Sequence, residues 1–182
     1  MTASPRWQVA VSWAVVGEGG HVAVRTSHWW EVAAAAREHR PARTLYHGAL
    51  ELVVDGRPLV VEMTPTWGRA TREVVATGPV GSRWLGWLPF FRYEIRYTRP
   101  PGPTGHGATV VSDRREAVEA VLAAVPHVPR LTWGRAVGPA RDMWSSNSVV
   151  SWVLAEAGLL DACAPPPGGR APGWDAGLDV RG

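Results

Sequence analysis

Residues 44–65 read TLYHGALELVVDGRPLVVEMTP, and this stretch predicts a β-hairpin. Two runs rich in β-branched and aromatic residues flank Asp55-Gly56, and an Asp-Gly pair between two such runs is a strong signal for a two-residue turn. With that turn, Val54 faces Arg57 and the register of the whole hairpin follows. A slip of one residue would move every side chain to the other face, so the predicted register can be checked.

One face of this hairpin carries a histidine and a carboxylate. Side chains alternate between the faces of a strand, so His47 and Glu62 share a face and lie diagonal to each other at a spacing of roughly 7 Å. A carboxylate in that place can fix the tautomer of an imidazole and stabilise its charged form. The alternatives are a structural, hydrogen-bonded His47 and a Glu62 paired with an arginine on the sheet.

The chain on either side of the hairpin predicts more strands first and helices later. Strands are expected at 7–16, 21–25, 73–77 and 91–98, a helix at 28–39, and a loop at 100–107.

Residues 113–125, DRREAVEAVLAAV, predict an amphipathic helix. Asp113 and Glu116 have the spacing of a capping box at its start. The apolar face repeats at i, i+3, i+4 and i+7 and consists of Val118, Val121, Leu122 and Val125.

A second helix is predicted at about 145–157, where the sequence begins SSNSVVSW and the helix ends before Gly158. Ser146 precedes valines at i+3, i+4 and i+7, so its side chain begins the buried stripe. The first turn of a helix offers free N–H groups and the positive end of the helix dipole, which favour a nucleophile or an oxyanion. Alternatively, Ser145 or Ser146 is an ordinary N-cap.

Composition restricts the class of protein. The 182 residues fit a single domain (1–182), and the single cysteine, Cys163, excludes an internal disulfide. All basic residues are arginines spread along the chain, whereas a nucleic-acid-binding surface needs a cluster, so no nucleic acid is expected. The histidines lack ligand spacing, so no metal or other cofactor is expected. No apolar run reaches the roughly 20 residues of an integral membrane segment, and the interpretation is a cytoplasmic protein.

These elements predict an α+β fold with a small, mainly antiparallel sheet packed against a few helices. The core of that fold is expected at 44–160. The C-terminal tail, 164–182, is expected to lack regular structure because it is rich in proline and glycine.

The motifs YHGALELVVDGRPLVVEM and SSNSVVSWVLAEAGL, in this order, resemble those of the circularly permuted papain-like group of bacterial cell-wall peptidases, amidases and acyltransferases. That group has a pattern similar to H-x-G-I … dG … v-I-E-A, followed later by C-S-x-L-V-x-W. The resemblance implies His47 as general base and Glu62 as the residue that orients it. It places Ser146 where the group has its nucleophilic cysteine, so the attacking atom changes from sulfur to oxygen.

The resemblance also implies that Asn147 and Ser148 belong to the substrate-binding cleft, and Trp84 and Trp87 are candidates for its rim. Two classes of function remain open. The first is a pseudoenzyme that binds a peptide or an acyl-containing ligand without cleaving it. The second is a serine-dependent hydrolase or acyltransferase that acts on an amide, thioester or ester bond.

Overall fold

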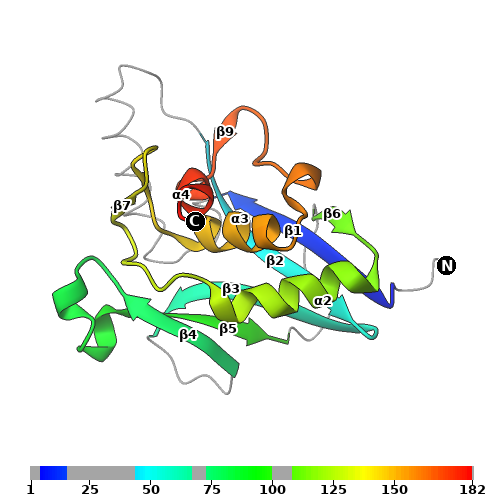
Figure 1. The fold of residues 1–182 in the computed structure, drawn as a ribbon, viewed down its shortest axis with the longest axis horizontal. Helices are drawn as coiled ribbons and strands as arrows, with labels where there is room; N and C mark the ends of the chain where they lie inside the picture. Colours follow the sequence, from blue (N-terminus) through cyan, green and yellow to red (C-terminus); the bar gives the residue numbers. More distant parts are fainter. Residues whose placement is uncertain (1–4, 16–43, 67–72, 100–107, 182) are drawn as a thin grey trace.

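The computed structural model describes residues 5–15, 44–66, 73–99 and 108–181. The predicted strand at 21–25, the helix at 28–39 and the loop at 100–107 lie outside these residues. In the described part, the chain has the predicted α+β fold, with a mainly antiparallel sheet and helices packed on it (Figure 1).

The sheet has the strand order β4-β5-β3-β2-β1-β6, and a short strand, β9, pairs in parallel with the start of β2. Its strands are β1 (Trp7–Val15), β2 (Thr44–Val54), β3 (Arg57–Pro65), β4 (Glu73–Pro79), β5 (Arg92–Thr98), β6 (Thr109–Ser112) and β9 (Gly169–Arg170).

The central hairpin has the predicted turn and register. β2 and β3 pair from Leu50 opposite Val61 to Val54 opposite Arg57. Asp55 and Gly56 both have positive φ, 51° and 77°, as a two-residue type I′ turn requires. The β2–β3 ladder ends at Leu50, while β2 continues along β1 as far as Tyr46. His47 therefore lies beyond the end of the hairpin ladder, on a part of β2 that β1 still supports.

Three α-helices in the described residues lie on one side of the sheet (Figure 1): α2 (Arg115–Ala124), α3 (Ser146–Glu156) and α4 (Trp174–Asp179). α2 contacts β1, and α3 packs on β2 and β3. α4 packs on α3, so α3 lies between the sheet and the C-terminal helix. Residues 146–155 are consequently all buried, and α3 is the central helix of the fold.

Shorter elements connect these parts. They are η1 (Arg83–Leu85), η2 (Pro89–Phe91), η3 (Val125–His127), β7 (Ala136–Val137), β8 (Asp142–Met143) and η4 (Leu160–Ala162). None of the helices in the described ranges is long and apolar enough to cross a bilayer.

The core lies between the sheet and the helices. β-branched and leucine side chains of the strands meet the valines of α2 and α3, as alternation on strands and helical periodicity predict. Its fully buried members include Val9, Val11, Leu50, Leu52, Ile95, Val118, Val121, Val125, Val153 and Leu154.

Two predictions about secondary structure were wrong, one about the start of α2 and one about the C-terminal tail. α2 begins at Arg115 with Arg114 as its N-cap, and no side chain caps it, so the Asp113–Glu116 capping box does not form. The reason is β6, a strand that the sequence analysis missed. Ser112, the last residue of β6, accepts a hydrogen bond from the Arg114 N–H at 3.2 Å, which turns the chain and starts the helix later than expected.

The C-terminal tail was also predicted wrongly, because 164–182 contains β9 and α4. Proline and glycine are unfavourable inside regular elements, but here the prolines lie outside β9 and α4, and Gly177, inside α4, contacts α3 closely. Gly173 has a φ of 93° at the N-cap of α4, a conformation that favours glycine. The tail is therefore an ordered part of the fold.

Candidate functional site

The candidate site centres on the start of α3 and the first half of β2. Ser145 is the N-cap of α3, so Ser146 occupies the first helical position. The Oγ atom of Ser146 lies 2.9 Å from Nδ1 of His47, within hydrogen-bonding distance. The two residues that the sequence expects to meet are thus in direct contact.

The protonation state of His47 follows from its surroundings. Although His47 as a residue is exposed, desolvation by the surrounding protein lowers the pKa of its imidazole from 6.5, while the charge of Glu62 opposes that shift. The net direction is downward, so the ring is neutral at neutral pH. When the proton of the neutral ring is on Nε2, Nδ1 is free to accept the Ser146 hydroxyl proton.

Glu62 acts on His47 through its charge, and it accepts two hydrogen bonds from β5. Its Oε1 accepts from Arg96 Nε at 3.0 Å and from Thr98 Oγ1 at 2.6 Å. The predicted alternative, pairing with an arginine on the sheet, is therefore present. The charge of Glu62 still raises the pKa of His47. That Glu62 also orients the imidazole stays a prediction.

Asn147 binds the backbone on both sides of His47. Its Oδ1 accepts from the Gly48 N–H at 2.7 Å, and its Nδ2 donates to the Tyr46 carbonyl at 2.9 Å and to the Pro172 carbonyl at 3.0 Å. Both donors of the amide are therefore in use. The structure thus gives Asn147 a positioning role, because it fixes the β2 segment that carries His47 against the start of α3.

The other small polar residues of this helix start hold the C-terminal segment (residues 169–179). Ser145 and Ser148 form a capping box, in which the Ser148 hydroxyl accepts from the Ser145 N–H. The hydroxyls of these two serines and of Ser151 donate to carbonyls of the C-terminal segment. These bonds run from Ser145 to Pro172 at 2.7 Å, from Ser148 to Gly173 at 2.7 Å and from Ser151 to Trp174 at 2.7 Å. The substrate-binding role predicted for Ser148 stays a prediction beside this structural one.

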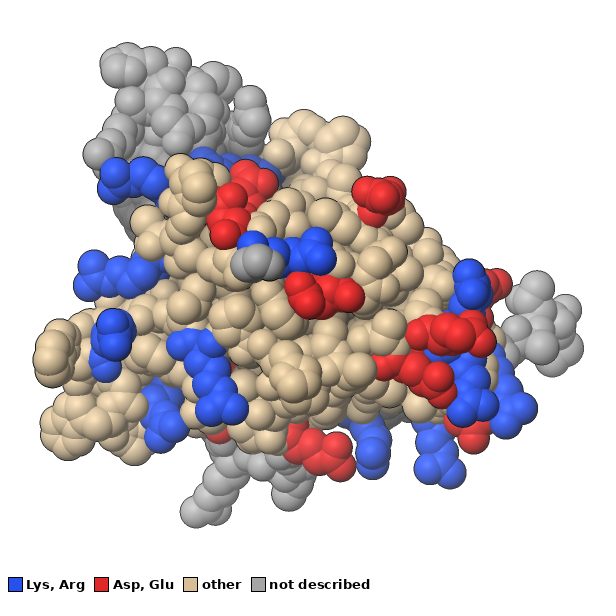
Figure 2. Space-filling model, in the orientation of Figure 1, with Lys and Arg blue, Asp and Glu red and all other residues tan. Residues whose placement is uncertain are grey.

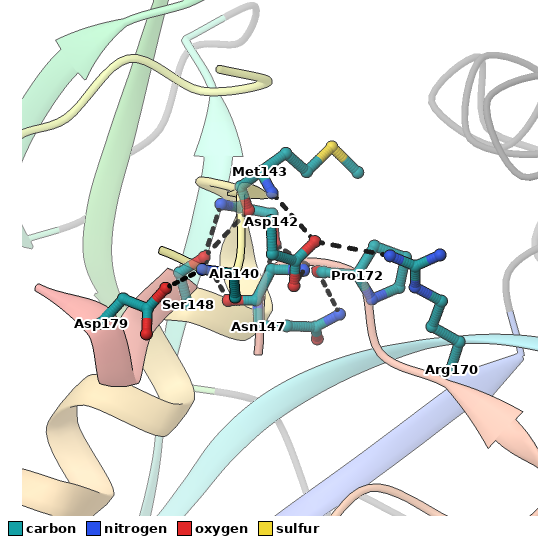
Figure 3. A network of polar contacts seen from close by, with 10 residues as sticks. Ala140, Asp142, Met143, Asn147, Ser148, Arg170, Pro172 and Asp179 are labelled. Carbon is teal, nitrogen blue, oxygen red and sulfur yellow. Dashed lines mark hydrogen bonds and ion pairs between the residues drawn. The ribbon is translucent and has the colours of Figure 1, made fainter. Parts of the chain in front are cut away.

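Asp142 completes this network and was missed by the sequence analysis (Figure 3). It is buried, and its carboxylate accepts from the Gly173 N–H at 2.6 Å and from the Met143 N–H at 2.9 Å. Arg170 lies 3.9 Å from Oδ1. Desolvation raises the pKa of Asp142, although these hydrogen bonds and the arginine oppose the shift.

A signal for this docking was present in the sequence. Gly173 and Gly177 are one helical turn apart, and Ser148 and Ser151 have a similar spacing on α3. A Cβ at Gly177 would collide with the Ser151 hydroxyl and the Ser148 carbonyl. Small residues facing each other on two helices predict close packing, which the sequence analysis did not test for this pair.

Ser146 differs from its neighbours because its hydroxyl contacts a side chain that can accept a proton. Within the part of the chain that the structure describes, its backbone N–H donates to no other residue. A free N–H at the positive end of a helix can stabilise an oxyanion. The arrangement can therefore support attack by the Ser146 hydroxyl on a carbonyl, with His47 as base.

Cys163 and the two tryptophans lie elsewhere in the fold. Cys163 follows η4, and desolvation raises the pKa of its thiol, so it lacks the activation that a nucleophilic cysteine needs. Trp84 and Trp87 belong to the connection between β4 and β5, at the edge of the sheet (Figure 1). Their assignment to substrate binding stays a prediction.

Comparison with known proteins gave no match: no family model, no curated protein and no solved structure is similar to this chain at a significant level. The resemblance to the permuted papain-like group rests on the two motifs alone. The function is therefore argued below from the geometry of the site.

Proposed function

We propose that this protein is a serine-dependent hydrolase or acyltransferase acting on an amide, thioester or ester bond, with a scaffold of the permuted papain-like kind. The contact of 2.9 Å between Ser146 Oγ and His47 Nδ1 carries the proposal. Proton transfer needs a base within hydrogen-bonding reach, and the lowered pKa of His47 keeps that base neutral.

The proposed reaction uses the two side chains in sequence. Ser146 Oγ attacks the carbonyl carbon of the substrate, and its proton moves to Nδ1 of His47. The carbonyl oxygen becomes an oxyanion beside the Ser146 N–H. When the bond to the leaving group breaks, the leaving group takes the proton from His47, and an acyl-serine ester remains. Water or another acceptor then attacks this ester, giving its proton to His47, which returns it to Ser146.

Binding without cleavage is a second candidate, and two observations favour it. Ser146 is 6% exposed, which restricts access of a substrate carbonyl to its hydroxyl. Glu62 is hydrogen-bonded to Arg96, which offsets the charge that would stabilise a protonated His47. In this case the surface around His47 binds a peptide or an acyl-containing ligand, and the pair of His47 and Ser146 contributes hydrogen bonds only.

A fluorophosphonate probe tests the proposal, since it reacts with activated serines. The protein should be labelled at Ser146, as located by mass spectrometry of the peptide that contains it. The label should be lost in Ser146→Ala and in His47→Ala. Ser112→Ala, which changes a serine on β6, is the matched control and should label as the unmodified protein does.

The variant Ser146→Cys separates the two candidates. A thiol beside a neutral imidazole at a helix start ionises below its ordinary pKa of about 8.5. No fluorophosphonate labelling together with an activated thiol would support binding without cleavage. No labelling together with an ordinary thiol titration would contradict both candidates.

A further inference from the structure

The connection between β4 and β5, here called the aromatic loop (residues 80–91), holds large apolar side chains in solvent. Trp84 is 87% exposed, Trp87 77% and Phe90 76%, and Leu85 and Phe91 are also exposed. Isolated apolar residues on a surface are ordinary, but five within one short segment form a patch of the kind that marks an interaction site.

The aromatic loop is fixed to the rest of the fold by hydrogen bonds, so the exposure of its side chains is a property of an ordered segment. The Val80 N–H donates to the Phe91 carbonyl at 2.7 Å and closes the base of the loop. The Gly81 N–H donates to the Trp133 carbonyl at 2.9 Å, and Thr66 Oγ1 donates to the Pro89 carbonyl. The two 3₁₀ turns, η1 and η2, order the residues between these ties.

The charged residues within the aromatic loop and at its end are arginines, and so is one that is hydrogen-bonded to its base. Arg83 lies in η1, and Arg92 follows the loop directly. The exposed Arg135 donates from Nε to the Gly81 carbonyl at 2.6 Å, so its guanidinium lies against the base of the loop. Residues 79–92, PVGSRWLGWLPFFR, contain no aspartate or glutamate. In Figure 2, the uncharged lobe at the lower left has arginines beside it.

We propose that the aromatic loop docks this protein on the surface of a lipid bilayer that contains anionic lipids. Tryptophan and phenylalanine side chains are favoured at the boundary between headgroups and acyl chains, and arginines beside them bind anionic headgroups. The loop projects from the edge of the sheet (Figure 1), and a projecting loop can insert into a bilayer. A protein partner of this loop would need an acidic, concave surface, so the positive, protruding shape favours the lipid surface.

Binding to vesicles tests this proposal on the full chain. Co-sedimentation should show binding to phosphatidylcholine vesicles that contain phosphatidylglycerol, with a much lower partition coefficient for phosphatidylcholine alone. The double variant Trp84→Ala/Trp87→Ala should lower the partition coefficient at least about tenfold. Arg83→Gln should lower it about fivefold, and added salt should weaken the binding of the unmodified protein.

Two matched controls keep the test specific. Val110→Ala removes an exposed apolar side chain from β6, at the opposite edge of the sheet, and Arg57→Gln removes an arginine from the central hairpin turn. Neither should change the partition coefficient by more than about twofold. Equal binding to both kinds of vesicle, no binding to either, or an equal loss in the controls would overturn the proposal. Self-association of the unmodified protein that the double variant abolishes would also overturn it, because a second copy would then cover the loop.

Discussion

Asn147 holds the two neighbours of His47, and the residue before Asn147, Ser146, contacts the His47 ring itself. One amide side chain binds the Tyr46 carbonyl and the Gly48 N–H, while Ser146 Oγ lies 2.9 Å from His47 Nδ1. These groups are about a hundred residues apart in the chain. The start of α3 thus carries both the proposed nucleophile and the group that positions its base.

Replacing Asn147 with alanine should therefore affect both stability and the site. The change removes the acceptor of the buried Gly48 N–H and one donor each from the Tyr46 and Pro172 carbonyls, of which Pro172 keeps the Ser145 hydroxyl. Lost hydrogen bonds of buried groups are costly. We expect a loss of about 3 kcal/mol in the free energy of unfolding, measured by chemical denaturation. The control Ser151→Ala removes one hydroxyl from the same helix and should cost about 1 kcal/mol. A variant that kept its stability would show that the three hydrogen bonds of Asn147 contribute little.

The pH dependence of labelling should report the protonation of His47. Its pKa lies below 6.5, so most of the rings are neutral at neutral pH and more than half are still neutral at pH 6.5. The rate of fluorophosphonate labelling should therefore fall to half of its maximum only below pH 6.5. The unfolded chain binds this proton more readily than the folded chain, so His47 also makes stability fall as the pH drops below 6.5. A half-maximal rate already above pH 6.5 would contradict this environment for His47.

Glu62→Gln should move the acid limit of labelling to lower pH. The Glu62 carboxylate raises the pKa of His47, and its removal leaves the positive charge of Arg96 less compensated, which acts in the same direction. An NMR titration of the His47 ring should therefore show a lower pKa in this variant. Glu119→Gln, on the exposed surface of α2, should leave the titration unchanged. A raised pKa of His47 in Glu62→Gln would contradict the electrostatic role of Glu62.

The sequence predicted the central hairpin and the last long helix well, because both are specified by local signals. Asp55-Gly56 sets the turn, and the turn sets the register that the structure shows. α3 begins and ends close to its predicted limits because Ser145 caps its start and Gly158, at a φ of 69°, follows its end. The contact between His47 and Ser146 could be predicted because each residue lies at a fixed place on one of these elements.

The remaining parts depend on contacts that local signals do not contain. β6 exists because it pairs with β1, and α4 exists because α3 receives it. A glycine at 173 or 177 lowers helix propensity locally, but it lets two backbones approach, and that gain appears only when the partner is known. The same holds for Asp142, whose partners lie in the C-terminal segment.

Gly177→Ala should show that close packing outweighs helix propensity. In an exposed helix the change would stabilise by about 1 kcal/mol. Here the new Cβ collides with the Ser148 carbonyl as well as the Ser151 hydroxyl, so α4 must move away from α3. We expect a net loss of about 2 kcal/mol in the free energy of unfolding. Adding Ser151→Ala should not restore it, because the Ser148 carbonyl is backbone and remains in place. Gly134→Ala, where nothing lies near the new Cβ, should cost about 1 kcal/mol through its positive φ alone.

Asp142 should make the docking of the C-terminal segment depend on pH in the acid range. Desolvation raises the pKa of its carboxyl above 3.8, so the folded chain holds this proton more tightly than the unfolded chain. The contribution of Asp142 to stability is therefore largest below pH 3.8 and declines as the pH rises through the folded-state pKa.

Asp142→Asn removes this titration, but its amide has one oxygen for the N–H groups of Met143 and Gly173, so one of them loses its acceptor. At neutral pH the variant should be less stable by about 2 kcal/mol in chemical denaturation. The stability of Asp142→Asn relative to the unmodified protein should improve from acid to neutral pH, and Asp161→Asn, an exposed carboxylate, should show no such trend. A relative stability of Asp142→Asn that worsens as the pH rises would mean that the hydrogen bonds and Arg170 dominate over desolvation, and that the charge of Asp142 stabilises the docked segment.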